Sequence, residues 1–203
     1  MTLAEIAADI RHASSTGILY PGDRISFRWR DGVWITETES DPAGLTEKDV
    51  KPLVIGSDIR SDDPDADLHS SIYHYNSRIG ALISSRAPFC KTVSSTGEKV
   101  RPYVDDIAQM IGIDIKCFKI EDKRKIINQL KKRGAILLKE MGALCAAASL
   151  DDLLAAAMIT EKACAIHVQA SFIGGAKAIN VIESALMRFV YMNFYSKKSV
   201  GKS

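Results

Sequence analysis

The sequence predicts an α/β fold, on the strength of three observations. Segments with helically spaced apolar residues alternate along the chain with short segments whose patterns are typical of strands. An Asp31-Gly32 pair between two of these strand segments predicts a hairpin turn. No internal repeat and no linker-like segment interrupts the chain. We therefore expect one α/β domain over residues 1–203.

The first half of the chain opens with a helix. Thr2 and Glu5 form a capping box, and Leu3, Ile6 and Ile10 recur at helical spacing, so we expect a helix that ends between residues 14 and 17. The elements expected next are strands at 24–29, 33–36 and 51–55, a helix at 65–75 and a short buried strand at 80–84.

The second half predicts a helix at 103–110, a strand at 113–118, an amphipathic helix at 121–132 and two neighbouring strands at 135–138 and 143–147. The basic residues between Lys123 and Arg133 could form an anion-binding face, but such runs are more often a solvated helix surface. Ser149 can cap a long helix that continues to about residue 171. Gly174-Gly175 then separates it from a last helix at about 177–195.

Composition excludes several classes of protein. Hydrophobic residues make up 46% and charged residues 26%, which is typical of a globular protein and excludes a disordered or fibrous one. The 27 basic and 25 acidic residues give no electrostatic basis for binding nucleic acid. The longest apolar stretches, such as 141–150, are too short to span a bilayer, and the N-terminal residues contain no signal-peptide core. We therefore expect a soluble cytoplasmic protein without nucleic-acid or membrane partners.

The four cysteines, Cys90, Cys117, Cys145 and Cys164, are dispersed and show no C-x-x-C spacing. This pattern indicates buried, reduced thiols, not a disulfide or zinc framework. Cys90 could be a nucleophile, because Arg86 is close in sequence and could lower its pKa. No histidine is placed to act as its base, so the sequence favours a buried thiol.

Several segments resemble one known family when they are taken together. Residues 65–73 read Asp-Ala-Asp-Leu-His-Ser-Ser-Ile-Tyr, a helix that contains H-x-x-I-Y, and the strand at 80–84 ends in Ser-Ser-Arg before a proline. Segments 22–28, 31–36, 45–50, 135–144 and 149–155 follow in the order of the family's further motifs. In this order and spacing, from the first helix to the last, the chain resembles the class II aldolase/adducin family.

The resemblance implies a fold, an assembly and a metal site. It implies a three-layer α/β/α protein with a central, largely antiparallel sheet, and a homo-oligomer, typically a tetramer, with its cleft near a subunit boundary. In the family's enzymes a His-x-His pair and a third histidine hold zinc, and these positions fall here on Ser84, Arg86 and Met141. A hydroxyl and a thioether are poor zinc ligands, and a guanidinium cannot coordinate. We therefore expect no metal and no other cofactor.

The family's phosphate pocket is altered as well. Its first-loop asparagine falls on Arg24, although Ser26 is kept, and its Ser-Gly falls on Thr38-Glu39. Its Pro-Ser-Ser-Glu falls on residues 62–65, so that Asp63 replaces a hydroxyl donor. Glu39 and Asp63 would place negative charge where an anion should bind. Asp65, which stands for the family's catalytic glutamate, is the one candidate catalytic residue.

The alignment brings acidic and basic side chains to one cleft. The residues expected to bind a substrate there are Arg24, Ser26, Thr38, Ser84, Arg86 and Glu140. Arg86 would supply the positive charge of the missing zinc by pairing with Asp65 or Glu140, since a guanidinium can bridge carboxylates. The alternative is that Arg86 points into solvent. A relocated metal site at Asp65 and His69, with His74 nearby, is less favoured than simple packing of these side chains.

Three functions remain open from the sequence. The first is a family member that has lost the zinc and sugar-phosphate site and is retained for binding or assembly, as in adducin. The second is a re-tasked or metal-independent lyase, epimerase or decarboxylase that uses Asp65 with Arg24 or Arg86 on a small sugar acid or carboxylate. The third is a subunit that completes active sites of an intact homologue. Arg24 distinguishes the first two, because a substrate-binding arginine should be exposed in an open cleft, whereas an inactive family member can hold it in an ion pair.

Overall fold

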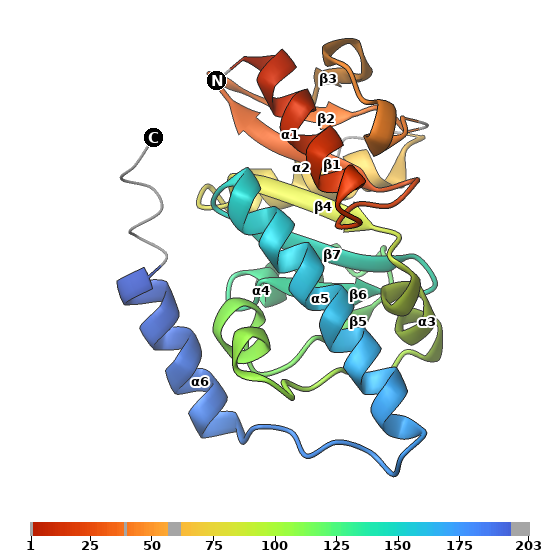
Figure 1. Cartoon of the computed structure of the whole chain (residues 1–203). Coiled ribbons are helices and arrows are strands. Elements are labelled where there is room, and N and C mark those ends of the chain that lie inside the picture. Colours follow the sequence, from red (N-terminus) through yellow and green to blue (C-terminus); the bar gives the residue numbers. More distant parts are fainter. Residues whose placement is uncertain (1, 39, 57–61, 196–203) are drawn as a thin grey trace.

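A seven-stranded sheet forms the centre of the molecule in a computed structural model that describes residues 2–38, 40–56 and 62–195 (Figure 1). The strand order is β3-β2-β1-β4-β7-β6-β5, and every neighbouring pair is antiparallel except β5 and β6. The strands are β1 (Arg24–Trp29), β2 (Gly32–Thr36), β3 (Val50–Pro52), β4 (Ala81–Ser85), β5 (Cys117–Phe118), β6 (Ala135–Leu138) and β7 (Gly142–Ala147). The predicted central, largely antiparallel sheet is confirmed.

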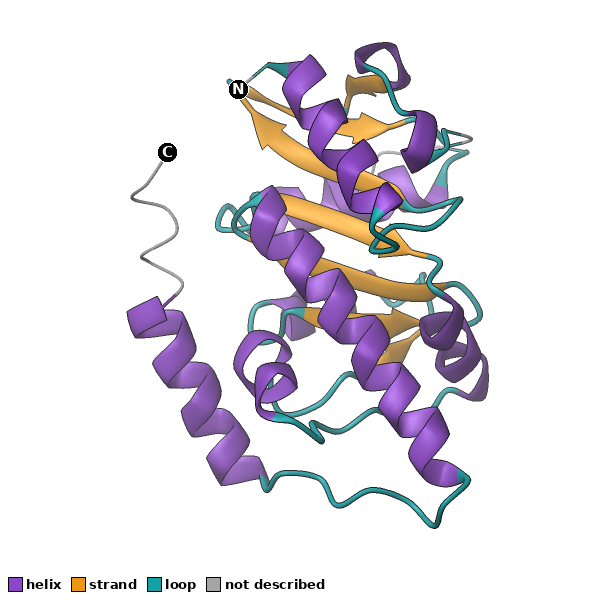
Figure 2. Ribbon diagram, viewed as in Figure 1, coloured by secondary structure: helices purple, strands orange, loops and turns teal. Residues whose placement is uncertain are grey.

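Helices cover both faces of this sheet (Figure 2). The helices are α1 (Leu3–Ser15), α2 (Pro64–Tyr75), α3 (Pro88–Thr96), α4 (Lys123–Leu130), α5 (Leu150–Ser171) and α6 (Val181–Val190). One apolar core joins α1, α3 and α5 to the sheet, and a second joins α2 and α4 to its other face. Neighbouring residues of β4 alternate between the two cores: Ile83 belongs to the first and Leu82 to the second. This alternation gives the three-layer arrangement.

Most predicted elements are present, with changed ends. The capping box of Thr2 and Glu5 begins α1, and Ser149 caps α5 by accepting from the Asp152 amide. The strand predicted at 51–55 is the shorter edge strand β3, which ends at Pro52, although the Leu53 amide still donates to the carbonyl oxygen of Val33 at 2.7 Å. The strand predicted at 113–118 is reduced to β5, and the helix predicted at 103–110 is a π-helical turn, η3 (Ile107–Ile111).

Helix α3 was not expected from the sequence. Four of its nine residues are serine or threonine, which have modest helix propensity. The helix depends on a distant residue: the carboxylate of Glu161, in α5, accepts from the Phe89 and Cys90 amides, both at 2.8 Å. Pro88 at the first turn and Gly97 beyond the end, with φ 76°, are the local signals that could have revealed it.

Helix α6 lies apart from the other helices (Figures 1 and 2). It starts later than the predicted residue 177 and is followed by a π-helical turn, η4 (Tyr191–Tyr195). It contacts η3, because the Arg188 guanidinium donates to the carbonyl oxygens of Gln109 and Met110. No helix among the described residues is long and apolar enough to cross a membrane.

Candidate functional site

The site is assembled where β1 and β4 lie side by side beneath the first turn of α2. The antiparallel register sets Arg24 opposite Ser84 and leaves Arg86 just beyond the end of β4. Asp63 begins α2, because its side chain accepts from the Ala66 amide at 3.1 Å, and this places Asp65 in the first helical turn. The sheet and the helix cap therefore bring together residues that lie far apart in the sequence.

Arg86 and Asp65 form an ion pair inside the site. Arg86 Nη2 lies 2.5 Å from Asp65 Oδ2, and the two side chains are 21% and 10% exposed. Arg86 Nη1 also donates to the carbonyl oxygen of Met141 at 3.1 Å. The predicted internal pairing of Arg86 is confirmed, and the alternative in which Arg86 points into solvent is wrong.

The partner in this pair is Asp65 and not Glu140. Glu140 is exposed in the turn between β6 and β7, where its φ is 64°. Its carboxylate makes no hydrogen bond or ion pair with the other described residues. The turn is tightly packed against the end of β4, because a Cβ at Gly142 would lie 2.1 Å from the carbonyl oxygen of Ser85. Glycine at this position therefore lets the turn approach Arg86.

Arg24 is buried, with only 2% of its surface exposed. Its guanidinium donates to Thr38 Oγ1 and pairs with Asp63 Oδ2 at 2.7 Å, and Thr38 Oγ1 in turn donates to the same carboxylate. Burial alone would raise the pKa of Asp63, but the Ala66 amide and the Arg24 charge hold that pKa below its ordinary value. Arg24, Thr38 and Asp63 thus form an ionic cluster in which the guanidinium is buried and the Asp63 side chain is 20% exposed. Glu39 lies outside the described residues.

His69 joins two of the candidate residues in a buried polar chain. Its Nδ1 lies 2.8 Å from Ser26 Oγ and its Nε2 lies 3.0 Å from Ser84 Oγ. Ser26 Oγ donates onward to the Tyr73 hydroxyl at 3.2 Å. Because the single proton of the Ser26 hydroxyl goes to Tyr73, we assign Nδ1 as the donor to Ser26, and Nε2 then accepts from Ser84.

The imidazole of His69 is held neutral. The residue is completely buried, and the loss of hydration lowers its pKa to about 4. Ser26 and Ser84, both expected to bind a substrate, instead contact His69. Asp65, His69 and Tyr73 recur at intervals of four residues on one face of α2. This spacing is the sequence pattern that could have indicated the buried polar chain of His69 and Tyr73.

A second buried acid, which the sequence did not single out, lies on the other side of Arg86. Asp23 is 2% exposed and accepts from the Arg86 amide at 2.5 Å and from the Tyr20 amide at 3.0 Å. Burial raises its pKa to about 6, although these hydrogen bonds oppose the change. Asp23 therefore anchors the backbone from which the Arg86 side chain reaches Asp65.

The three residues that the resemblance aligns with the family's zinc ligands do not fit that metal. Ser84 bonds to His69, the Arg86 guanidinium occupies the site as an ion-paired cation, and Met141 offers only a thioether. Within residues 2–38, 40–56 and 62–195, no three histidine, cysteine, aspartate or glutamate side chains are grouped to hold a metal ion. Asp65 and His69 have other partners, so the structure gives no support to a relocated site.

The cysteines have structural surroundings. Cys90, Cys145 and Cys164 are buried and unbridged, as predicted, whereas Cys117 is only half-buried. Cys90 Sγ lies 3.8 Å from Cys164 Sγ, and this contact together with burial raises the pKa of Cys90 well above its ordinary value. The Cys90 thiol is thus not an activated nucleophile.

Known structures share this architecture. An L-fuculose 1-phosphate aldolase superposes with a TM-score of 0.80 at 19% identity, over 94% of this chain and 95% of that one. The L-fuculose 1-phosphate aldolase from Glaciozyma antarctica PI12 gives 0.76 at 19% identity, over 97% and 85% of the two chains. YgbL from Klebsiella pneumoniae, described as a putative aldolase/epimerase/decarboxylase, gives 0.76 at 16% identity, over 91% and 98%. Identities this low show a common fold only.

Sequence comparison identifies the protein family. No curated protein matches the chain. The profile of the Class II Aldolase and Adducin N-terminal domain matches residues 21–168, which include β1, the hairpin, α2, β4 and most of α5. With the antiparallel sheet, the α2–β4 site and this match taken together, the chain belongs to the class II aldolase and adducin family.

Proposed function

We propose that this family member lacks the zinc-dependent sugar-phosphate chemistry of the aldolases and acts in binding or assembly. The observation that carries the proposal is the 2.5 Å ion pair between Arg86 and Asp65. It places a permanent cation at a zinc-ligand position and uses it to neutralise the carboxylate at the catalytic position. The positive charge of Arg86 is thus neutralised by Asp65 and is not available to bind a substrate.

Arg24 supports the same conclusion. The alternative function, a metal-independent lyase, epimerase or decarboxylase, needs an arginine that can bind a small sugar acid or other carboxylate. Arg24 is 2% exposed and paired with Asp63, so a substrate would have to break a buried ion pair to reach it. Ser26 and Ser84 would similarly have to leave His69. The geometry therefore favours a binding or assembly role over this alternative.

A ligand screen with an activity assay tests the proposal. We expect no thermal stabilisation by zinc, with or without a sugar phosphate, and no cleavage or epimerisation of sugar phosphates. A bound ligand at about 100 times its Kd stabilises a protein by about 2.7 kcal/mol, which such a screen detects easily. Joint stabilisation by zinc and a sugar phosphate would contradict the proposal. Metal-independent turnover of a small sugar acid would establish the alternative function.

We also propose that the chain is a homo-oligomer, a tetramer by analogy with the family, in the cytoplasm. The support is the exposed apolar face of α6, where Ile182, Leu186 and Phe189 recur at helical spacing and are 83%, 61% and 61% exposed. Apolar faces of this kind mark protein interfaces. A second copy of the chain is the proposed occupant, because α6 lies apart from its own sheet (Figure 2).

Charged substitutions on α6 test the assembly. Leu186→Asp and Phe189→Asp are expected to convert the oligomer into smaller species, because burying a carboxylate in an apolar interface is unfavourable. The measurement is mass by light scattering after size exclusion. Met158→Asp on α5 is the control, since Met158 is also apolar and 50% exposed. A wild-type monomer would refute this proposal, and a larger assembly formed only with a zinc-binding homologue would favour the role of a completing subunit.

A further inference from the structure

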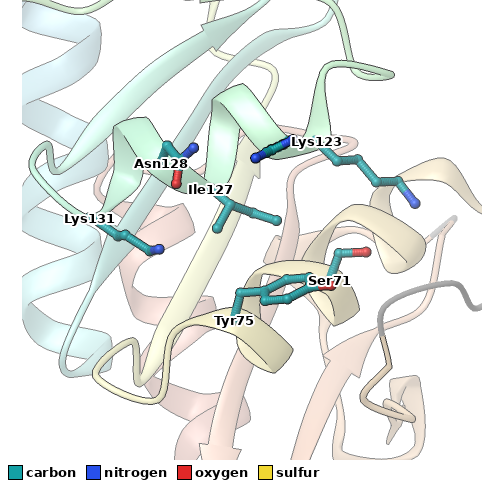
Figure 3. A pocket seen from close by; sticks show the side chains of 7 residues that line it. Ser71, Tyr75, Lys123, Ile127, Asn128 and Lys131 are labelled. Carbon is teal, nitrogen blue, oxygen red and sulfur yellow. The ribbon is translucent and has the colours of Figure 1, made fainter.

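A pocket of about 510 Å³ lies between α2 and α4, on the face of the sheet that carries the second core. Figure 3 shows Tyr75 and Ser71 on one side of it and Lys123, Ile127, Asn128 and Lys131 on the other. Arg124 completes the lining. None of these residues belongs to the Arg86–Asp65 site, and the volume is within the range of small-molecule pockets.

The charge of this pocket is positive. Three cations line it, and no described lining residue is acidic. Lys123 pairs with Asp67 at 2.5 Å on its rim. Arg124 and Lys131 are exposed, and among the described residues neither has an acidic partner. The opposite side of α4 differs, because Lys125 there is already paired with Asp122 at 2.9 Å. The uncompensated charge is thus concentrated on the pocket side of the helix.

A second pocket of about 470 Å³ continues the first. The two share Tyr75 and Lys131, and the second adds Arg78, Arg133 and Arg188 without adding an acidic lining residue among those described. Arg133 is compensated by Asp114, at 3.1 Å, but Arg78 has no acidic partner among the described residues. A basic groove therefore extends on both sides of Tyr75.

Tyr75 gives the groove an aromatic wall. Tyr75 is 54% exposed, and its ring meets the neighbouring His74 ring edge to face, with ring centroids 4.7 Å apart at 89°. Ile127 is buried opposite it and provides an apolar contact at the base. An exposed aromatic ring can stack on a planar ligand group while nearby cations bind that ligand's anionic groups.

The spacing of the cations indicates the size of the ligand. Arg124 and Lys131 lie seven residues apart, which corresponds to about 10 Å along a helix. A polyphosphate is long enough to contact both side chains without drawing them together. We propose that this groove binds a nucleoside polyphosphate, with its base against Tyr75 and its phosphates along Arg124 and Lys131, the two lining cations of α4 that have no acidic partner among the described residues.

Binding of ATP to the full chain, measured by calorimetry, tests this assignment. Arg124→Glu and Lys131→Glu are each expected to weaken ATP binding by about tenfold or more, because each replaces a cation that donates hydrogen bonds to the phosphates with a carboxylate that repels them. Lys132→Glu is the matched control, since Lys132 is the exposed neighbour of Lys131 and lines neither pocket. It is expected to change the affinity by no more than about twofold at physiological salt.

Tyr75→Ala and two further ligands identify what the groove recognises. Stacking predicts that Tyr75→Ala weakens ATP binding but leaves the binding of inorganic tripolyphosphate unchanged. Four results would overturn the proposal: no ATP binding, an equal loss in Lys132→Glu, tripolyphosphate binding as tightly as ATP, or tighter binding of a single-stranded oligonucleotide. Circular dichroism of each variant verifies that it is folded, so that lost binding can be assigned to the groove.

Discussion

Arg86→Met is expected to lower the free energy of unfolding by about 3 kcal/mol or more at neutral pH. The substitution removes the cation but leaves the Asp65 carboxylate in a site where its side chain is 10% exposed. One oxygen of that carboxylate, Oδ1, already lacks a hydrogen-bond partner among the described residues. Removing the guanidinium therefore leaves a buried charge with no compensation. Urea unfolding of the wild type and the variant measures the loss.

The double variant Arg86→Met/Asp65→Asn separates the ion pair from simple packing. Because the second substitution removes the unpaired charge, the double variant is expected to be more stable than Arg86→Met alone. Met also preserves much of the apolar stem of arginine, so lost packing contributes little. A double variant as unstable as the sum of the two single variants would show that the two side chains do not interact.

The sequence predicted this ion pair because the resemblance aligned Arg86 with a metal ligand and Asp65 with a catalytic acid. It could not specify which acid would be the partner. That choice depends on the turn after β6, where Glu140 has a positive φ and projects to the surface. The geometry of such a turn follows from its packing against β4 and is not encoded in local propensity.

The sequence left two states of Arg24 open: exposed in a substrate-binding cleft, or locked in an ion pair. Arginine is rarely buried fully, and the sequence alone did not decide between these states. The structure shows the ion pair, because Thr38 and Asp63 come from a hairpin and a helix cap that meet only in the folded chain. The helices and most strands were predictable from periodicity and caps, whereas α3 depends on Glu161, more than seventy residues away.

Two buried groups of the site titrate in the acid range, and they affect stability in opposite directions as the pH falls. His69 has its folded pKa near 4, below the ordinary 6.5, so the unfolded chain binds a proton first and stability falls as the pH drops through this window. Asp23 has its folded pKa near 6, above the ordinary 3.8, so the folded chain binds the proton first and stability rises as the pH drops from about 6. Each group changes the free energy of unfolding by up to about 3 kcal/mol, and the two changes nearly cancel.

Asp23→Asn should therefore make the protein acid-sensitive. The variant lacks the stabilisation that protonation of Asp23 gives the wild type. Acidification from about pH 7 to 4.5 is therefore expected to lower its free energy of unfolding by about 2 kcal/mol more than that of the wild type. His69→Gln should show the reverse, becoming more stable relative to the wild type over the same range. Unfolding by urea at a series of pH values measures both. Carboxylates with lowered pKa, such as Asp63, act mainly below this range, since their unfolded value is 3.8. Parallel pH profiles for the wild type and both variants would show that neither buried group controls stability.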